Sequence, residues 1–388
     1  MKKFYICGGW CPRRKLDAQR IYNYFVKNGW KFTKNLSSAN IIIIYTCGSF
    51  DRTEERSLLT VAEMLKKKSL KTKVIVTGCL VKINPQKIVK KEDIIVIPHE
   101  KLSRLDKIID AKAKFSSVAD VNVPSAVPDL LGKSKDILSI NALKKYLKNI
   151  SKKVLKINHK SSTSYRILIS RGCLGVCTYC VIRFAHGRLK SKPLNKVISE
   201  FKSGLRQGYK LFELQGEDIG CYGFDIGTNI VELLKKIFAH KGTYKLVLEN
   251  FNPQWLIKFY ADLLPLFLRN KERIKYIMVP IQSGSNSVLK LMRRPYSIEE
   301  VRACLKDLKR KIPDLELQTH ILVGFPGEKE KDFNESKKIL REIDFADVYV
   351  YEYQDRPHTE ASKMKNKNSN RTKLSRFNRL SRFVNISK

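Results

Sequence analysis

Apolar and polar residues alternate between strand and helix patterns over the first hundred residues. Four apolar runs have the length and β-branched content of buried strands: "KFYICGG" (3–9), "ANIIIIYTC" (39–47), "KVIVTGC" (73–79) and "DIIVIP" (93–98). Three segments between them have helical patterns: 16–28, 53–67 and the vicinity of 85–90. Buried strands that alternate with helices predict a parallel sheet, so we expect residues 1–115 to form an α/β domain.

A second series of strand patterns begins near residue 162. Six apolar runs recur with helical segments between them: "YRILIS" (165–170), "KLFELQG" (210–216), "YKLVLEN" (244–250), "IKYIMVPIQ" (274–282), "LELQTHILVG" (315–324) and "ADVYVYEY" (346–353). This alternation predicts a parallel barrel or a partial barrel, (β/α)6, over residues 161–362. The expected fold class is therefore α/β, with a parallel sheet domain followed by a barrel.

Two basic segments fall outside these series. Residues 116–160 begin with the Pro, Ser and Gly content of a linker and continue into a helical pattern with one apolar face and one lysine face. Residues 363–388 form a basic tail without an acidic residue, and its apolar residues predict a short amphipathic helix. Each basic face is either the solvated side of a docked helix or a surface for an anionic partner.

The charge balance of the chain is strongly basic. Lys and Arg number 76 against 37 Asp and Glu, a net charge of +39. This excess favours RNA as a partner, because neutralised phosphates release counterions, although a solvated lysine surface or an acidic peptide partner also fits. No apolar run is long enough to span a membrane and the N-terminus lacks a signal peptide, so we expect a cytoplasmic protein without membrane association.

Cys173, Cys177 and Cys180 form a C-x3-C-x2-C cluster after the first predicted barrel strand, where barrel active sites are built. A structural zinc site has four protein ligands, and a catalytic zinc site is usually rich in histidine. Three thiolates within eight residues instead favour an iron–sulfur cube with one iron open to a substrate. The alternative is a zinc site completed by His186 or a distant residue.

Further cysteines lie at the ends of strands in the first domain. Cys47 and Cys79 end two predicted strands, and Cys11 lies in the loop after another. Because the carboxyl ends of parallel strands meet at one edge of a sheet, these three residues are expected to gather there. Cys221 and Cys304 have no partner pattern and are expected to be small buried thiols.

The segment "CLGVCTYC", with an aromatic residue before its last cysteine, resembles the signature of the radical S-adenosylmethionine (SAM) enzymes. In that superfamily three cysteines hold a [4Fe–4S] cluster whose open iron chelates the amino and carboxylate groups of SAM. An electron from the cluster cleaves a carbon–sulfur bond of SAM and yields a 5′-deoxyadenosyl radical. The resemblance therefore implies that Cys173, Cys177 and Cys180 hold this cluster and that SAM is a cofactor.

Other segments narrow the resemblance, over about residues 4–364, to the radical SAM methylthiotransferases. Eight of them are similar to family blocks: "CPRRKLDAQRI", "YTCGSFDRTEERSL", "VTGCL", "HGRLKSKP", "EDIGCYGFDIGTNIVELL", "VPIQSGSNSVLKLMRRPY", "ILVGFPGE" and "YQDRPHTEASKM". The first three carry Cys11, Cys47 and Cys79, which the resemblance assigns to a second, auxiliary [4Fe–4S] cluster, with Cys7 as a neighbouring thiol. The family usually ends in a small β-barrel, the TRAM domain, which we expect this chain to lack.

The resemblance also implies contacts to SAM, and no catalytic residue is expected beyond the cluster ligands. Six residues are expected to bind the cofactor: Tyr179, Gln215, Glu217, Gln282, Ser283 and Gly324. The tyrosine is expected to help place the adenine, with a packing role as the alternative. Glycine in the "GFPGE" turn either lets the backbone approach a ligand or simply forms a tight turn.

The expected activity is insertion of a methylthio group at an unactivated C–H bond of a macromolecule. SAM would both donate a methyl group to sulfur on the auxiliary cluster and supply the radical. A tRNA adenosine beside the anticodon is the leading acceptor, and a side chain of a protein or ribosomally made peptide is the alternative. A non-catalytic iron–sulfur protein that binds RNA is a third hypothesis. The family also implies an electron donor such as flavodoxin or ferredoxin.

Overall fold

A computed structural model describes residues 1–8, 11–88, 94–124 and 164–386 of the chain. The chain divides into two compact units, unit 1 (Met1–Thr163) and unit 2 (Ser164–Lys388). Both are built on parallel sheets, which confirms the predicted α/β fold class. The basic helix predicted within residues 116–160 lies outside the described residues from residue 125 onward. In the part of the chain that the structure describes, no helix has the length and apolar character needed to cross a membrane.

Unit 1 contains a five-stranded sheet with the order β2-β1-β3-β4-β5, in which every neighbouring pair is parallel. Its strands are β1 (Lys3–Gly8), β2 (Lys31–Phe32), β3 (Ile41–Thr46), β4 (Lys73–Gly78) and β5 (Ile94–Val96). The central strand β3 is buried along its whole length, as expected for an "IIIIYT" run covered on both faces.

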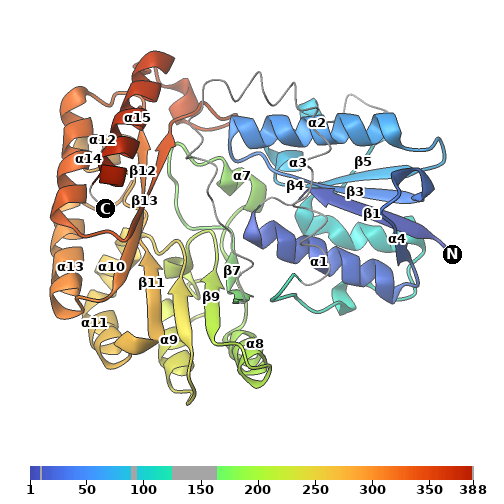
Figure 1. Cartoon of the computed structure of the whole chain (residues 1–388), viewed down its shortest axis with the longest axis horizontal. Helices are drawn as coiled ribbons and strands as arrows, with labels where there is room; N and C mark the ends of the chain where they lie inside the picture. The colour runs from blue at the N-terminus through green and yellow to red at the C-terminus, as the bar shows by residue number, and fades with distance from the viewer. Residues whose placement is uncertain (9–10, 89–93, 125–163, 387–388) are drawn as a thin grey trace. The chain divides into compact units, whose positions relative to one another are not determined.

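Helices cover both faces of this sheet (Figure 1). One face packs against α1 (Pro12–Lys27) and α4 (Leu105–Ile109), and the other against α2 (Asp51–Lys67) and α3 (Leu80–Ile83). Alternate residues of β3 enter the two cores, since Ile43 belongs to the first and Ile44 to the second. Each fully buried aliphatic side chain of this kind contributes about 2 kcal/mol.

Short 3-10 turns complete unit 1: Leu36–Ser38, Pro85–Lys87, His99–Arg104 and Phe115–Ser117. The described part of the helix predicted near 85–90, which extends to residue 88, contains a 3-10 turn, and the α-helix α3 lies before it. Asn84 has a φ of −146°, because the ring of the following proline disfavours helical backbone at that residue. The two-residue strand β2 is too short to leave a periodic signal in the sequence.

The first residues of the predicted linker pack on unit 1. Phe115 and Val118 are buried in the core on the α1 face. Arg20 of α1 donates from Nε to Val118 O at 3.0 Å and pairs with Asp120 at 3.0 Å. The chain is thus attached to unit 1 at least as far as Asp120.

Unit 2 contains a six-stranded parallel sheet with the order β13-β12-β11-β10-β9-β6. Its strands are β6 (Tyr165–Leu168), β9 (Leu211–Gln215), β10 (Lys245–Leu248), β11 (Ile274–Met278), β12 (Glu316–Val323) and β13 (Asp347–Glu352). All six lie within the six predicted runs. A small antiparallel pair, β7 (Ser170–Arg171) and β8 (Lys190–Ser191), brackets the cysteine cluster.

The crossover helices of unit 2 lie along the curved sheet (Figure 1). The α-helices of the unit are α7 (Ile182–His186), α8 (Leu194–Arg206), α9 (Ile230–Phe238), α10 (Pro253–Lys258), α11 (Tyr260–Arg269), α12 (Asn286–Leu291), α13 (Ile298–Lys311), α14 (Glu330–Glu342) and α15 (Asn370–Ile386). Three 3-10 turns accompany them: Ile219–Cys221, Lys271–Arg273 and Ala361–Lys363.

The basic tail forms α15, which packs against β13 and α14. Leu380 of α15 is fully buried. Arg379 of the same helix stacks on Phe333 of α14, with 4.7 Å between the guanidinium carbon and the ring centroid. Of the two predicted roles for the tail, docking on the barrel is therefore observed. The outer face of α15 still exposes Arg371 and Arg382.

Candidate functional site

The loop from Cys173 to Cys180 follows β6 and β7 and is fixed at both ends. Gly172 N donates to Glu217 Oε2 at 2.8 Å, and Thr178 Oγ1 donates to Leu291 O at 2.9 Å. Gly172 has a φ of +72°, and a Cβ there would lie 2.1 Å from Arg188 O. Only glycine fits at this position, so the sequence forces the chain to turn directly before the first cysteine.

The thiol of Cys173 accepts two hydrogen bonds and lies beside a carboxyl group. Gly175 N donates to Cys173 Sγ at 3.1 Å. A hydrogen bond from Cys221 lowers the pKa of Cys173, which favours the thiolate that a metal requires. Sulfur atoms of Cys173 and Cys221 and an oxygen of Asp218 all lie within 4.8 Å of one another. Cys221 is fully buried, as expected, but it lies beside the cysteine cluster, which the sequence did not indicate.

The donor set of this loop suits an iron–sulfur cluster. Three thiols come from eight residues, and thiolates are the usual ligands of such clusters. A Cβ on Gly175 would lie 3.2 Å from Cys173 Sγ and 3.7 Å from Cys177 Sγ, so the glycine keeps the space beside both sulfurs clear. Burial raises the pKa of the Cys180 thiol to about 11, so this thiol needs a cation to ionise.

Arg294 approaches the cluster loop from the segment between α12 and α13. Its Nη1 donates to Cys177 Sγ at 3.4 Å, and its Nη2 donates to Asn252 Oδ1 and Pro280 O, both at 3.0 Å. Its Nε donates to Tyr296 OH at 2.7 Å. Arg294 lies in the "LMRRPY" part of a family block, but nothing in its sequence spacing indicates a contact with the cysteine loop.

Asp218 forms a second polar centre beside the loop. It accepts hydrogen bonds from Trp255 Nε1 at 2.9 Å and from Gly220 N at 3.0 Å. Burial raises the pKa of Asp218, whereas the indole hydrogen bond and the nearby Arg294 charge oppose that rise. The carboxyl group thereby holds the "EDIGC" segment in place next to Cys173.

The "QGED" turn contains two of the predicted SAM contacts. Gln215 donates from Nε2 to Glu213 Oε2 at 2.9 Å, while its buried Oε1 accepts no hydrogen bond within the described part of the chain. A buried amide oxygen without a partner is suited to a ligand that donates to it. Glu217 instead binds Gly172 N and lies 3.9 Å from His186 Nε2. Its geometry is that of a residue that supports the loop.

The predicted contacts after β11 lie on an irregular segment. Gln282 has a φ of +70°, which is uncommon for a residue with a side chain. Its backbone N donates to His320 O, and Leu322 N donates to its carbonyl, both at 2.8 Å. Ser283 is fully buried, and its Oγ accepts from Ser285 N at 3.2 Å. A backbone strained by about 1 kcal/mol or more and held by two hydrogen bonds is a feature common at ligand sites.

Tyr179 contacts Phe325, the residue that follows Gly324 in the sequence. The ring of Tyr179 meets that of Phe325 edge to face, with centroids 6.3 Å apart. Gly324 has a φ of +74°, its N–H is bound by Glu328, and a Cβ there would lie 2.4 Å from Lys373 Cγ. The positive φ and the close approach of Lys373 on α15 both favour glycine at this position.

A pocket of about 520 Å³ lies beside the cluster loop. It is lined by Val176 of that loop and by residues of α12 and the following turn: Asn286, Lys290, Arg293, Arg294, Pro295, Tyr296 and Ser297. Arg293 is exposed and forms an ion pair with Glu360, in which Nη1 donates to Oε1 at 2.6 Å. Three of its lining residues, Lys290, Arg293 and Arg294, are basic, so the pocket has a basic lining.

In unit 1, Cys11, Cys47 and Cys79 follow β1, β3 and β4, three neighbouring strands. Cys11 is the N-cap of α1 and Cys79 precedes α3 directly. The structure thus places the three residues at the carboxyl edge of one sheet. Cys7 lies inside β1 and packs in the core on the α2 face, where burial raises the pKa of its thiol to about 12.

Two glycines let the strands that carry these cysteines end close to β3. A Cβ on Gly8 would lie 1.9 Å from Tyr45 O, and one on Gly78 would lie 2.2 Å from Thr46 O. Both have positive φ values, +87° and +104°. The chain can therefore turn away immediately after β1 and β4.

A buried polar network accompanies the cysteines of unit 1. Arg14 of α1 pairs with Asp17, which lies 3.7 Å from His99 Nε2, and Tyr45 OH lies 2.6 Å from His99 Nδ1. Burial lowers the pKa of Arg14, but Asp17 and the thiols of Cys79 and Cys11 raise it well above its ordinary value. The guanidinium is therefore within electrostatic reach of two of the three thiols.

Comparisons with known proteins agree with this arrangement. Residues 167–340 match the model of the radical SAM superfamily, and residues 3–97 match that of the uncharacterized protein family UPF0004. The chain is 34% identical, over 94% of its length and 80% of the relative's, to a probable threonylcarbamoyladenosine tRNA methylthiotransferase of Pyrococcus abyssi. It is 30% identical, over 94% and 78%, to the ribosomal protein uS12 methylthiotransferase RimO of Carboxydothermus hydrogenoformans.

Among solved structures, the radical SAM methyltransferase TsrM of Kitasatospora setae superposes with a TM-score of 0.62. The match covers 93% of this chain and 77% of that protein at 14% identity, so it bears on the fold alone. The parallel sheet of unit 2, the three thiols after its first strand and the match to the family model together identify the chain as a radical SAM enzyme. The chain belongs to the radical SAM methylthiotransferase family, as its sequence motifs predicted.

Proposed function

We propose that this enzyme inserts a methylthio group into a threonylcarbamoyladenosine of tRNA, next to the anticodon. The identity of 34% with the Pyrococcus abyssi protein of that name, over 94% of this chain, carries the proposal. The net charge of +39 supports a polyanionic acceptor. The reaction replaces one C–H hydrogen of the adenine with a methylthio group whose methyl group comes from SAM.

Cys173, Cys177 and Cys180 would hold the [4Fe–4S] cluster, which supplies the electron that cleaves bound SAM. The residues around the loop fix the positions of the thiols: Glu217 binds the backbone before Cys173, and Thr178 attaches the loop to Leu291. The free amide oxygen of Gln215 and the irregular backbone at Gln282 are the features that we assign to SAM. Tyr179, Ser283 and Gly324 would support this SAM site through their packing.

An auxiliary cluster would be held by Cys11, Cys47 and Cys79. Their position on three neighbouring strands supports this assignment, as does the buried Arg14 near Cys11 and Cys79. A guanidinium beside thiolates favours their ionised form. Sulfur for the methylthio group would be delivered from this second site.

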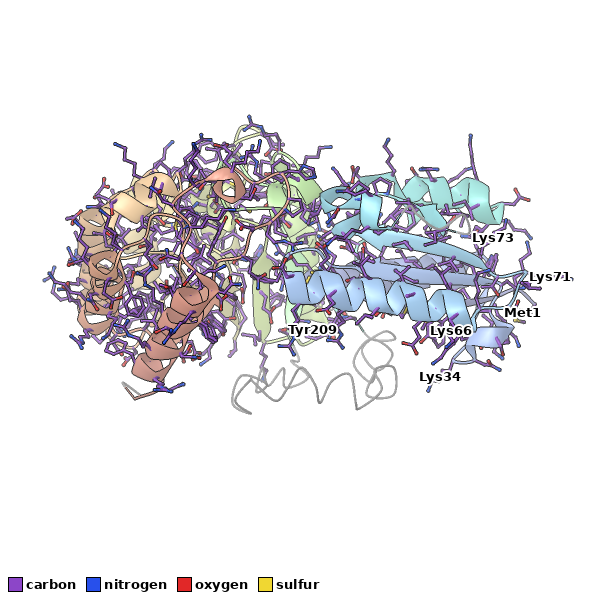
Figure 2. All side chains as sticks on the ribbon, turned by 90° about the horizontal axis from the view of Figure 1, so that it is seen from above. Met1, Lys34, Lys66, Lys71, Lys73 and Tyr209 are labelled. Carbon is purple, nitrogen blue, oxygen red and sulfur yellow. The ribbon has the colours of Figure 1, made fainter. Side chains whose placement is uncertain are left out.

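Basic surfaces on both units would contact the RNA backbone. In unit 1, exposed lysines crowd the edge at which the strands begin, opposite the cysteines, and Figure 2 shows Lys34, Lys66, Lys71 and Lys73 there. In unit 2, the outer face of α15 offers Arg371 and Arg382. Contacts of this kind position an RNA without reading its sequence, and their affinity falls steeply with salt.

Two measurements test the proposal. Anaerobically reconstituted protein, reduced with dithionite or by flavodoxin, should convert SAM to 5′-deoxyadenosine, and the Cys177→Ala variant should not. Mass spectrometry of tRNA nucleosides from a deletion strain should show loss of 2-methylthio-threonylcarbamoyladenosine, with return on complementation. If these nucleosides are unchanged while SAM cleavage persists, the acceptor is not this tRNA nucleoside, and a search for methylthiolated protein, as in the RimO relative, replaces it.

A further inference from the structure

Arg294 is a buried cation that has no carboxylate partner. Its exposed fraction is 8%, and within the described residues no carboxylate oxygen lies within 4.0 Å of its guanidinium. Its hydrogen bonds go to an amide oxygen, a backbone carbonyl, a tyrosine hydroxyl and the Sγ of Cys177. Of these acceptors, only the cysteine becomes an anion when it binds a metal.

Two other buried arginines among the described residues form ion pairs with a carboxylate. Arg14 pairs with Asp17 inside unit 1, and Arg376 pairs with Glu328 inside unit 2 at 2.8 Å. An uncompensated buried charge is strongly destabilising, and arginine does not lose its proton in proteins. The fold therefore retains a permanent positive charge at Arg294, which acts on the buried carboxyl of Asp218 without a hydrogen bond to it and donates directly to the thiol of Cys177.

The guanidinium is also held rigidly. Asn252 precedes α10, Pro280 follows β11, and Tyr296 lies in the turn before α13, so Arg294 joins three segments of unit 2. Tyr296 OH in turn donates to Ile281 O at 3.0 Å. Because these hydrogen bonds hold the Nε and Nη2 groups of Arg294, its Nη1 group points in a defined direction toward Cys177.

We propose that Arg294 is a positioning residue that supplies the compensating charge for the cluster at Cys177 and thereby raises its reduction potential. The inference rests on the proposed cluster at Cys173, Cys177 and Cys180 and is independent of the acceptor. A fixed positive charge next to a thiolate ligand stabilises the reduced, more negative cluster more than the oxidised one. The residue would make the one-electron reduction that precedes SAM cleavage easier.

The test is a redox titration of the reconstituted cluster, followed by electron paramagnetic resonance. Cys11, Cys47 and Cys79 are changed to Ala so that only the cluster of unit 2 contributes. Arg294→Gln should move the midpoint potential to more negative values by at least 59 mV, the equivalent of a tenfold change in a one-electron equilibrium. Arg293→Gln is the matched control, because this neighbouring arginine is exposed and paired with Glu360, and its potential should equal that of the parent protein.

Arg294→Lys separates charge from packing. Lysine keeps the positive charge but cannot bridge Asn252, Pro280 and Tyr296 as a planar fork does. We expect a lower melting temperature with a potential close to that of the parent. Equal potentials in Arg294→Gln, Arg293→Gln and the parent would overturn the proposal. If Arg294→Gln does not fold, a folded Arg294→Lys protein whose potential moves by more than 59 mV would overturn it as well. Neither result depends on methylthio transfer, so both are distinguishable from a failure of the proposed function.

Discussion

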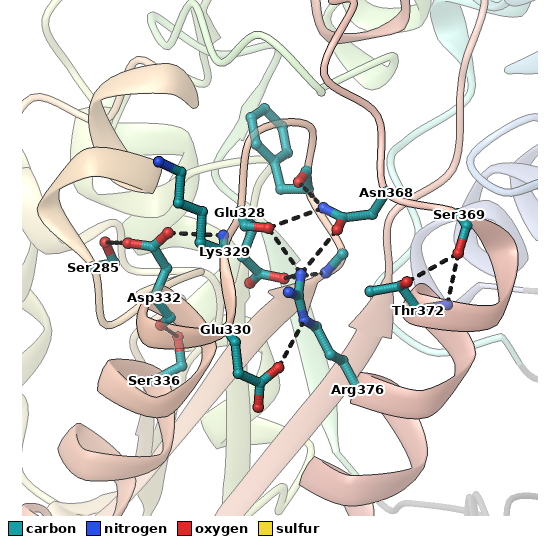
Figure 3. Close-up of polar contacts among 12 residues, drawn as sticks. Ser285, Glu328, Lys329, Glu330, Asp332, Ser336, Asn368, Ser369, Thr372 and Arg376 are labelled. Atoms are coloured by element: carbon teal, nitrogen blue, oxygen red, sulfur yellow. Dashed lines mark hydrogen bonds and ion pairs between the residues drawn. The ribbon is translucent and has the colours of Figure 1, made fainter.

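Arg376 donates from Nη1 to Glu328 Oε2 over 2.8 Å, and both side chains are almost fully buried (Figure 3). Gly324 N donates to the same carboxylate oxygen at 2.7 Å, and Arg376 also binds Glu328 O at 3.0 Å. The pair joins α15 to the "GFPGE" turn, which directly follows β12. The C-terminal helix therefore fixes a turn at the carboxyl end of the barrel sheet, where ligands of such folds bind.

At pH 8, where the carboxyl of Glu328 is ionised in wild type, replacing Arg376 by Met should destabilise unit 2 by about 3 to 5 kcal/mol, because Glu328 would remain buried without its cation. Urea unfolding followed by intrinsic fluorescence measures this change. Arg379→Met is the matched control on the same helix, since Arg379 is 44% exposed and pairs with Glu330 at the surface. That change should cost no more than about 1 kcal/mol. Equal losses in the two variants would contradict the role given to the buried pair.

Burial raises the pKa of Glu328 to about 7, and the Gly324 N–H and Arg376 only partly oppose this rise. A carboxyl group whose pKa is higher in the folded than in the unfolded state stabilises the fold at low pH. Its contribution is complete below the unfolded value near 4.5 and is lost as the pH rises through 7. The free energy of unfolding should therefore fall by roughly 3 kcal/mol more in wild type than in Glu328→Gln between these pH values. Parallel pH profiles of the two proteins would contradict this assignment.

The strands and the cysteine triads could be predicted from the sequence because their signals are local. Buried parallel strands appear as continuous apolar runs, and "CLGVCTYC" holds its three thiols within eight residues. The edge position of Cys11, Cys47 and Cys79 followed from strand order alone, since each ends or follows a predicted strand.

The residues that surround the thiols could not be predicted in this way. Cys221 approaches Cys173 from a different strand crossover, and Arg294 approaches Cys177 across 117 positions of sequence. Neither has a spacing that marks it, because tertiary packing brings them to the loop. The basic amphipathic pattern of the tail predicts its helix. Its docking could not be predicted, because it depends on a hydrogen bond from Arg376 to a buried glutamate 48 residues away in the sequence.

The two cysteine triads should be separable by iron analysis. Alanine at Cys173, Cys177 or Cys180 should remove about half of the iron and abolish SAM cleavage, because under the proposed assignment each triad would hold one cluster of equal size. Alanine at Cys11, Cys47 or Cys79 should remove the other half, leave SAM cleavage intact and abolish sulfur insertion. Iron and 5′-deoxyadenosine are measured on anaerobically reconstituted protein.

Cysteines outside the triads provide the controls for that experiment. Cys7 packs in the core of unit 1, and Cys304 lies on α13, where burial raises the pKa of its thiol to about 12. Changing either to Ser should leave the iron content unchanged. Loss of half the iron in Cys7→Ser would instead make Cys7 a ligand of the auxiliary cluster. If changing a single triad removed all of the iron from the protein, two independent sites would be ruled out.

Gly175 offers a test of the space beside the thiols. Its φ is not positive, so alanine fits the backbone, and the only penalty is a Cβ 3.2 Å from Cys173 Sγ and 3.7 Å from Cys177 Sγ. The apoprotein of Gly175→Ala should unfold within about 0.5 kcal/mol of wild type, while its retained iron and rate of SAM cleavage should fall. Val176→Ala is the control, because this neighbour is 43% exposed and its removal should leave both iron and cleavage unchanged. Full iron retention in Gly175→Ala would mean that the cluster lies on the other side of the loop.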